Sequence, residues 1–162
     1  ELVKDIQLLD ICEIETIKNC PKKYQTENVT FRPKSLKKVS NLSAKPSNLQ
    51  HFIEPFDSLF GNNNRTVDLT EIQNIQHSLQ FIKAENPRIY PADTQRVLSK
   101  LRVKFTFKNQ RFDLPITDIK FWQKAVEDKS IIKNFEALYL TISLGLPHRG
   151  EHYKLAAGVI RV

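Results

Sequence analysis

A stretch of strict two-residue alternation, KLRVKFTFKNQRFDLPITD at residues 100–118, constrains the fold of this chain most strongly. Apolar residues at every second position from 101 to 107 alternate with polar ones, namely Arg102, Lys104, Thr106 and Lys108. Because successive side chains of a strand point to opposite faces, this pattern predicts a strand with one buried and one solvated face. A turn at Asn109-Gln110 is expected to return the chain, so that Lys108 opposes Arg111. The sequence therefore predicts a β-hairpin with a basic outward face.

This basic face is a candidate anion-binding surface. In the predicted register Phe107 opposes Phe112, Thr106 opposes Asp113, and the like-charged pair Lys108 and Arg111 costs about a few tenths of a kcal/mol unless an anion or solvent relieves it. Arg102 and Lys104 extend the same stripe, a pattern that suits contact with phosphates. No aromatic side chain is expected on this face, and Asp113 neutralises part of it, so base stacking is not predicted. The alternative is a solvated strand face without a ligand.

The strands around the hairpin define an order of elements. Residues 78–85 predict a strand, and a proline-containing loop is expected to run from there to about Arg96. After the hairpin and a helix come two more alternating stretches, residues 137–145 and 152–162. Three small residues in the last stretch predict a bend or a close backbone approach, Ala156, Ala157 and Gly158. Three strands, a helix and two strands form the element order of an OB fold, a small five-stranded β-barrel.

The intervening helix is predicted over residues 118–129. Thr117 is a candidate N-cap, and Asp118 is a second residue suited to capping this helix. One helical face is expected to be buried and carries Ile119, Trp122 and Val126.

The N-terminal half is less regular. Residues 10–17 predict one strand, residues 27–31 a second extended segment, and residues 32–46 a basic connector with at most a short strand. Ser47 and Gln50 match a capping box at the start of a short helix.

A further helix start is expected at Asp68 and Glu71. We therefore predict three regions, namely a partial first OB-like unit at 1–46, a helical bridge at 47–76 and a second OB-like barrel at 77–162.

The composition is that of a basic globular chain. Its 162 residues include 40% hydrophobic residues and carry a net charge of +7, which favours an acidic partner such as nucleic acid. No run approaches the ~18 apolar residues of a membrane span, and the first residues lack the features of a signal peptide. Cys12 and Cys20 are too few for a disulfide framework. The sequence therefore predicts a cytoplasmic protein that does not bind membranes, and it indicates no oligomeric state.

Several landmarks, in this order, resemble the bacterial dual-OB-domain family. They are LLDICEIE, CPKKYQTENVTF, LFGNNNR, RFDLPITD, LYLTISLG and HYKLAAGVI, and they span about Leu8 to Ile160. The resemblance implies two OB-like units and nucleic-acid binding, often in loci linked to defence against foreign DNA. None of the landmarks is a catalytic motif, so the resemblance specifies the fold more closely than the activity.

The chain also departs from the family pattern. Members usually begin with a Cys/Lys/Gly-rich strand region that leads to a Trp-Ile-Arg-Pro-like stretch, and neither is found here, which implies an incomplete first unit. The loop after Phe60 usually carries an Arg-Gly pair, whereas this chain has Asn62-Asn63-Asn64-Arg65. The expected fold class is therefore a β-rich α+β protein with two OB-like small β-barrels, the first partial, and short connecting helices.

Three further segments hold candidate anion-binding residues. The first is the turn with Lys22, Lys23 and Tyr24, for which a solubilising loop is the alternative. The second is the loop LPHRGEHY with Arg149 and the following Lys154, where OB folds often bind ligands. The third is the polar loop that ends at Arg65 and that also suits a simple turn.

No enzyme signature accompanies these segments. The loop LPHRGEHY lacks a zinc-binding pattern, the four glycines do not form a phosphate-cradling loop, and no nucleophile motif is present. We therefore expect a protein that is not an enzyme and that needs no metal or cofactor.

The predicted function is a non-catalytic nucleic-acid or nucleotide-binding module that contacts phosphates, with single strands favoured and little sequence preference. The alternatives are a protein-interaction or scaffold subunit of a larger assembly, and a sensor of a small phosphorylated ligand.

Overall fold

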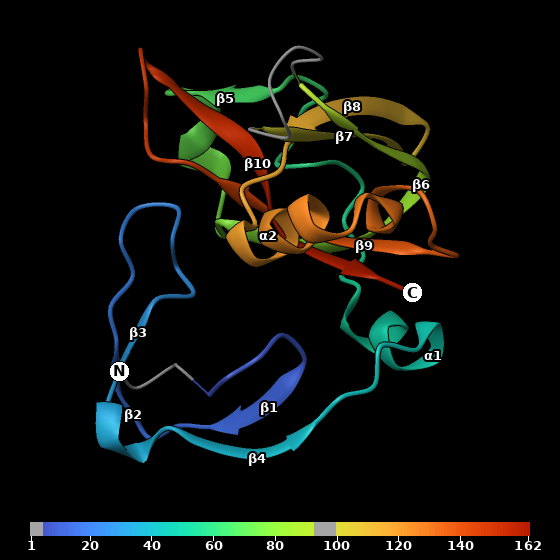
Figure 1. Cartoon of the computed structure of the whole chain (residues 1–162). Helices are drawn as coiled ribbons and strands as arrows, with labels where there is room; N and C mark the ends of the chain where they lie inside the picture. Colours follow the sequence, from blue (N-terminus) through green and yellow to red (C-terminus); the bar gives the residue numbers. More distant parts are fainter. Residues whose placement is uncertain (1–4, 93–99) are drawn as a thin grey trace.

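The fold is mostly β, with a curled six-stranded sheet in the C-terminal half (Figure 1). The computed structural model describes residues 5–92 and 100–162. Neighbouring strands of the sheet are antiparallel and lie in the order β5-β10-β9-β6-β7-β8. The strands are β5 (Thr66–Asp68), β6 (Leu79–Pro91), β7 (Leu101–Phe107), β8 (Gln110–Pro115), β9 (Leu138–Leu144) and β10 (Glu151–Arg161).

The sheet curls until its two ends approach each other. Just beyond β8, Ile116 forms a parallel bridge with Ala156 of β10, and the Thr117 amide donates to the Ala156 carbonyl at 2.9 Å. The pairing of β10 with β9 shifts between Ala156 and Gly158, and a Cβ on Gly158 would lie 3.1 Å from Thr141 Oγ1. The predicted bend and close approach in the last strand are therefore confirmed.

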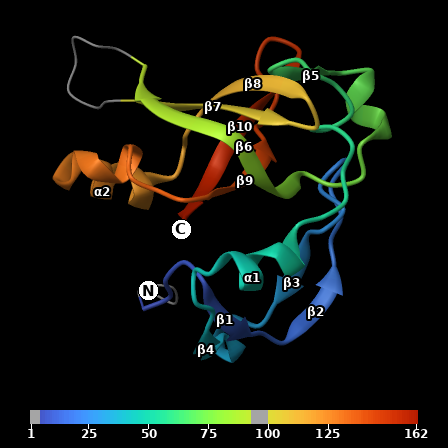
Figure 2. The ribbon, with the colours of Figure 1, turned by 90° about the vertical axis from the view of Figure 1, so that its right-hand side faces the viewer.

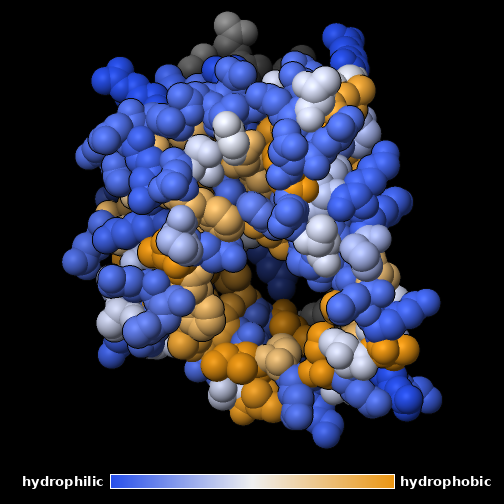
Figure 3. All heavy atoms as spheres, turned by 180° about the vertical axis from the view of Figure 1, so that it is seen from behind, coloured by the Kyte–Doolittle hydropathy of each residue, from blue (hydrophilic) through white to orange (hydrophobic). Residues whose placement is uncertain are grey.

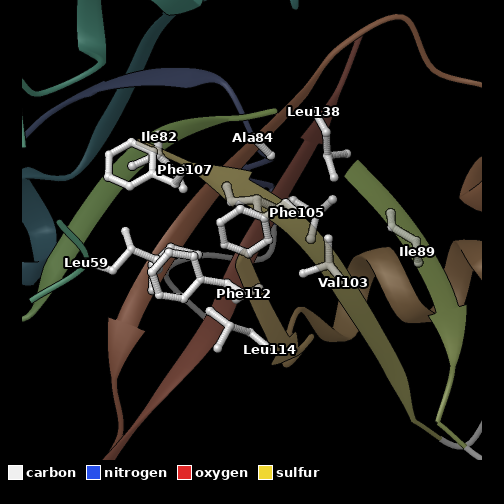
Figure 4. Close-up of a cluster of buried hydrophobic side chains, with 14 of the residues drawn as sticks. Leu59, Ile82, Ala84, Ile89, Val103, Phe105, Phe107, Phe112, Leu114 and Leu138 are labelled. Atoms are coloured by element: carbon white, nitrogen blue, oxygen red, sulfur yellow. The ribbon is translucent and has the colours of Figure 1, made fainter. Parts of the chain in front are cut away.

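The β7–β8 hairpin turns one residue earlier than predicted. Lys108 and Asn109 occupy the turn with φ of 50° and 63°, a conformation that suits the right-handed twist of a two-residue hairpin and that asparagine adopts readily. Phe105 consequently pairs with Phe112, and the predicted opposition of Lys108 and Arg111 is wrong. Because the pairing moves by two residues, the same side chains stay buried (Figure 4).

Strand β6 extends well beyond the predicted strand at 78–85. Its first part pairs with β9 and its last part with β7, and the register shifts between Glu85 and Arg88. Asn86, with φ of 49°, and Pro87 lie in this bulge, where a strand tolerates proline. The prediction of a loop is wrong for the residues up to Pro91, which belong to β6. The rest of the predicted loop, to about Arg96, lies mostly outside the described residues.

Helix α2 (Ile119–Glu127) buries a face that overlaps the predicted one only at Trp122, which packs against the core. Phe121 and Ala125 are buried, whereas Ile119 and Val126 are 70% and 42% exposed. The N-cap is Asp118 and not Thr117, since Asp118 Oδ1 accepts from the Phe121 amide at 2.9 Å. Asp118 Oδ2 also accepts from the Val159 amide of β10 at 3.0 Å, which ties the start of the helix to the sheet. A 3-10 helix, Lys129–Ile132, follows α2.

The N-terminal part consists of two antiparallel ribbons, β1 with β4 and β2 with β3, below the curled sheet (Figure 2). Their bounds are β1 (Asp10–Glu13), β2 (Thr16–Asn19), β3 (Val29–Phe31) and β4 (Lys37–Asn41). The single strand expected at 10–17 is thus two strands, and a 3-10 helix (Pro33–Ser35) precedes β4. The proposed unit boundaries at 46 and 76 stay a prediction.

Short helices connect the ribbons to the sheet. Helix α1 (Pro46–Leu49) continues into a 3-10 helix (Gln50–Phe52), and another 3-10 helix covers Glu71–Asn74. The N-cap of α1 is Lys45, with Pro46 at the first helical position, so the predicted capping role of Ser47 is wrong. No described helix is long and apolar enough to cross a membrane.

Two hydrophobic clusters stabilise this arrangement. The larger fills the inside of the curled sheet and includes Val103, Phe105 and Leu114 (Figure 4). The smaller contains Leu49 of α1 and Tyr139 of β9, with Leu9 and Leu42 of the N-terminal part packed against it. The ribbons are therefore attached to the outside of the sheet through apolar packing.

Candidate anion-binding surface

The outward side chains of β6, β7 and β8 form one polar surface. Val103, Phe105 and Phe112 point into the core, so the residues that alternate with them face outward. We call this surface the outer β6–β8 face, and its three cross-strand rows are Glu85–Thr106–Arg111, Arg88–Lys104–Asp113 and Tyr90–Arg102–Pro115. The predicted basic face of the hairpin is thus one part of a three-stranded surface.

Asp113 is the central acceptor on this face. Arg102 donates from Nε to Asp113 Oδ1 at 2.8 Å and from Nη2 to the Asp113 carbonyl at 2.7 Å. Tyr90 donates its hydroxyl to Asp113 Oδ2 at 2.7 Å. Although partial burial opposes it, the hydrogen bonds from Tyr90 and Arg102 lower the pKa of the Asp113 carboxyl. Arg102 and Asp113 therefore hold each other within the sheet surface.

Other cations surround this pair and stay open to solvent. Lys104 Nζ lies 4.0 Å and Arg65 Nη2 3.7 Å from Asp113 Oδ2, and their side chains are 58% and 67% exposed. Arg88 and Arg111 are also exposed. Five cationic residues thus face two carboxylates, Glu85 and Asp113, which leaves an excess of positive charge for an external anion.

An aromatic residue lies on this face, contrary to the prediction. Tyr90 is half-buried beside Arg102, and Lys104 Nζ lies 5.0 Å from the centroid of its ring. Because the ammonium covers the ring in a cation–π contact, Tyr90 is not an open platform for base stacking. Arg88 and Tyr90 escaped the sequence analysis because Pro87 indicated a loop, although Arg88, Ile89 and Tyr90 continue the alternation of a strand.

Lys154 lies inside the protein, so its predicted contact with an external anion is wrong. Its side chain is 1% exposed, and Nζ donates to the carbonyl and the Oδ1 of Asn62, both at 2.7 Å. Burial lowers the pKa of Lys154 to about 8. Its backbone amide donates to the Arg65 carbonyl at 2.9 Å, and Asn62 Nδ2 donates to the Thr66 carbonyl at 3.1 Å. Lys154 and Asn62 therefore fix the loop that carries Arg65 to the outer β6–β8 face.

The remaining predicted residues are scattered. Tyr24 is buried, makes an edge contact with His152 at 4.8 Å and donates to the Gly145 carbonyl at 3.4 Å, so its predicted surface role is wrong. Lys22 and Lys23 are exposed in the preceding turn, and Arg149 is exposed in a turn between β9 and β10. These three cations lie in turns outside the three strands of the outer β6–β8 face. Lys108 and Arg111 extend that face at the hairpin end.

Within residues 5–92 and 100–162, no three His, Cys, Asp or Glu side chains are grouped as a metal site. Apart from Glu85 and Asp113, the charged groups of the outer β6–β8 face are guanidinium and ammonium groups, which bind and orient anions.

A curled β-sheet with this strand order defines a binding domain of the OB type. The family comparison agrees, because the chain matches the dual OB-containing domain (DuOB) over residues 1–159 and so belongs to that family. Neither a curated protein nor a solved structure matches it.

Proposed function

We propose that this protein is a non-catalytic nucleic-acid-binding module that contacts phosphates through the outer β6–β8 face. The observation that carries the proposal is the excess of exposed cations on that face, supported by Arg65 from the fixed loop. OB domains bind oligonucleotides on the face formed around their second and third strands, which correspond to β7 and β8 here. We expect single strands to be favoured, as for OB domains that bind oligonucleotides. Base readout is weak, since Lys104 covers the Tyr90 ring.

The size of the salt effect follows from the available charges. Arg65, Arg88, Lys104 and Arg111 are exposed, whereas Arg102 is engaged with Asp113. Four phosphate contacts to a single strand give a slope of about −3 in log K against log[salt]. Between about 50 and about 200 mM salt, the affinity should therefore fall about 50-fold.

The test is fluorescence anisotropy with labelled single- and double-stranded DNA and RNA at those two salt concentrations. The variant Arg88→Glu/Arg111→Glu reverses two exposed charges of the face. The variant Lys129→Glu/Lys133→Glu makes the same charge change at exposed positions beyond α2 and is the matched control. We expect the face variant to lose at least about tenfold in affinity at low salt and the control to lose much less.

Two outcomes would overturn the proposal. Equal losses in the face variant and the control would show an effect of net charge alone. If no binding is detected below ~100 μM at low salt, the affinity is weaker than that of ordinary non-specific DNA binding, and the proposal is overturned. A third variant, Lys22→Glu/Lys23→Glu, tests the other predicted basic segment, and competition by a mononucleotide would indicate a sensor of a small phosphorylated ligand.

One observation favours a scaffold role as the second candidate function. Apolar side chains are exposed on the N-terminal ribbons, where Figure 3 shows hydrophobic atoms gathered in the lower part of the molecule. They include Ile11, Ile17 and Val39, which are 43%, 59% and 56% exposed. Exposed apolar surface of this kind commonly marks protein contacts. If the wild-type protein does not bind nucleic acid in the test above and self-associates or captures a partner through the ribbons, the scaffold role is favoured.

A further inference from the structure

A second candidate site lies outside the outer β6–β8 face. A pocket of about 420 Å³ is lined by the segment from Phe56 to Gly61 and by residues between Glu71 and Gln80. This volume lies within the usual range of small-ligand sites. No lining residue belongs to the rows of the outer β6–β8 face, so the pocket is a separate site from the proposed nucleic-acid contact.

One side of the pocket is aromatic. The His77 ring stacks on Phe56 with centroids 4.6 Å apart and lies 5.7 Å from Phe60. Phe56 and His77 are half-buried, so they retain accessible surface, whereas Phe60 is buried. The Phe60 backbone has φ of 53°, an uncommon conformation for a bulky residue. Such conformations cluster at ligand-binding sites, and this one supports a functional reading of the pocket.

The charge of the pocket is opposite to that of the chain. The chain has 25 Lys and Arg residues against 18 Asp and Glu residues, yet the lining contains Asp57 and Glu71 and no Lys or Arg. Glu71 Oε2 accepts from Asn62 Nδ2 at 2.7 Å and from the Asp68 amide at 3.2 Å, which fixes its carboxylate. Asp57 is exposed. Glu71 also interacts electrostatically with the buried Lys154 ammonium, so Asp57 is the carboxylate that remains open to an external cation. The exposed Asp57 carboxylate attracts cations and repels phosphates.

Amide and carbonyl groups add further acceptors. Gln80 lines the pocket and is 1% exposed, and its Nε2 lies 3.1 Å from His77 Nε2. Its Oε1 has no hydrogen-bond partner among the described residues. A buried acceptor without a partner is costly, so a donor group that comes within reach of this oxygen would be stabilised.

We propose that this pocket binds an organic cation, a primary ammonium or guanidinium group on an alkyl stem. The charge lies near Asp57, and the stem packs against Phe56 and His77. Carboxylates combined with aromatic rings recognise such groups through charge-assisted hydrogen bonds and cation–π contacts. The same chemistry is offered by a free polyamine and by a lysine or arginine side chain of another protein.

The test is a titration of ¹⁵N-labelled protein, followed by NMR, with agmatine, spermidine and Nα-acetyl-lysine amide. The Nε-acetylated form of the lysine amide lacks the charge and is the neutral control probe, and AMP is the anionic one. We expect saturable shifts of backbone amides in residues 56–61 and 71–80 with the cationic probes alone. Preference for spermidine or agmatine indicates a free small molecule, and preference for the lysine amide indicates a side chain of a partner.

Substitution separates the charge from the shape of the pocket. Asp57→Asn should weaken cation binding about tenfold, and the control Glu54→Gln, which also removes an exposed carboxylate but lies outside the lining, should leave it unchanged. Equal binding of the neutral probe, tighter binding of AMP, no saturable shift, or equal effects of the two substitutions would each overturn the proposal. None of these results bears on oligonucleotide binding by the outer β6–β8 face.

Discussion

Raising the pH should stabilise this protein through one buried amine, Lys154. Its pKa is about 8 in the folded chain, against the ordinary value of 10.5 expected when the chain unfolds. Between these values the unfolded chain binds more protons than the folded one, so the free energy of unfolding rises with pH in this window. At pH 7 the amine is charged in both states, and the cost of burying the charge is fully present.

The magnitude follows from the two pKa values. Between pH 7 and pH 10 the gain in unfolding free energy reaches at most about 2.5 kcal/mol for this single group. Local relaxation and water penetration reduce the cost of a buried charge, so we expect about 1–2.5 kcal/mol. Tyr24 and Tyr90, whose pKa values burial raises, act in the opposite direction near pH 10. A comparison with a variant that keeps both tyrosines removes their contribution.

The assay is urea denaturation at pH 7 and pH 10 of the wild type, Lys154→Met and Lys129→Met. Methionine keeps most of the length of the lysine side chain without its charge, and Lys129 is an exposed control. The wild-type stability should rise relative to Lys154→Met by about 1–2.5 kcal/mol over this interval and stay parallel to Lys129→Met. A difference from Lys154→Met that does not change with pH would refute the reasoning, because it would mean that the Lys154 amine titrates as it does in water.

Two substitutions test contacts that β10 makes with the start of α2 and with Thr141 of β9. Asp118→Ala removes both the cap of α2 at the Phe121 amide and the acceptor of the Val159 amide, so thermal or urea unfolding should show a loss of about 2–3 kcal/mol. A loss under about 0.5 kcal/mol, the range of ordinary surface substitutions, would contradict this. Gly158→Val places a branched side chain against Thr141, and the crowding should destabilise the protein by about 1–3 kcal/mol. Restoration of stability in Gly158→Val/Thr141→Ala would identify the contact, and failure of the smaller residue to restore any stability would argue against it.

Most strands and the identity of their buried sides could be predicted from the sequence because these depend on local alternation. The hairpin at 101–115 and the strand at 138–144 were recognised in this way, and the family comparison confirms the dual-OB family. The turn of the hairpin was misplaced by one residue, because Lys108 accepts a positive φ that its residue type does not indicate. Moving the turn by one residue moves the pairing of the two strands by two residues. The same side chains then stay buried, so the pattern of apolar residues cannot reveal the shift.

The candidate site was recognised only in part for the same reason. The alternation of the hairpin predicted Arg102, Lys104 and Arg111. Arg88 and Tyr90 were missed because Pro87 indicated a loop, although the strand continues past this proline. The bulge at Asn86 and Pro87 carries the strand past the proline, and only the pairing with β7 establishes that.

Position in the fold also decided the role of individual polar residues. Lysine and tyrosine are residue types that commonly bind ligands at a protein surface, yet Lys154 and Tyr24 are both buried. Lys154 lies on the inward side of β10 with His152 and Ala156, and its amine is hydrogen-bonded by Asn62, a residue 92 positions earlier in the sequence. The sequence by itself determined the β-rich class, the order of elements along the C-terminal half and the basic character of the chain, because these arise from local periodicity and residue counts. The tertiary structure alone decided which cations remain exposed, since burial depends on segments that meet only when the chain folds.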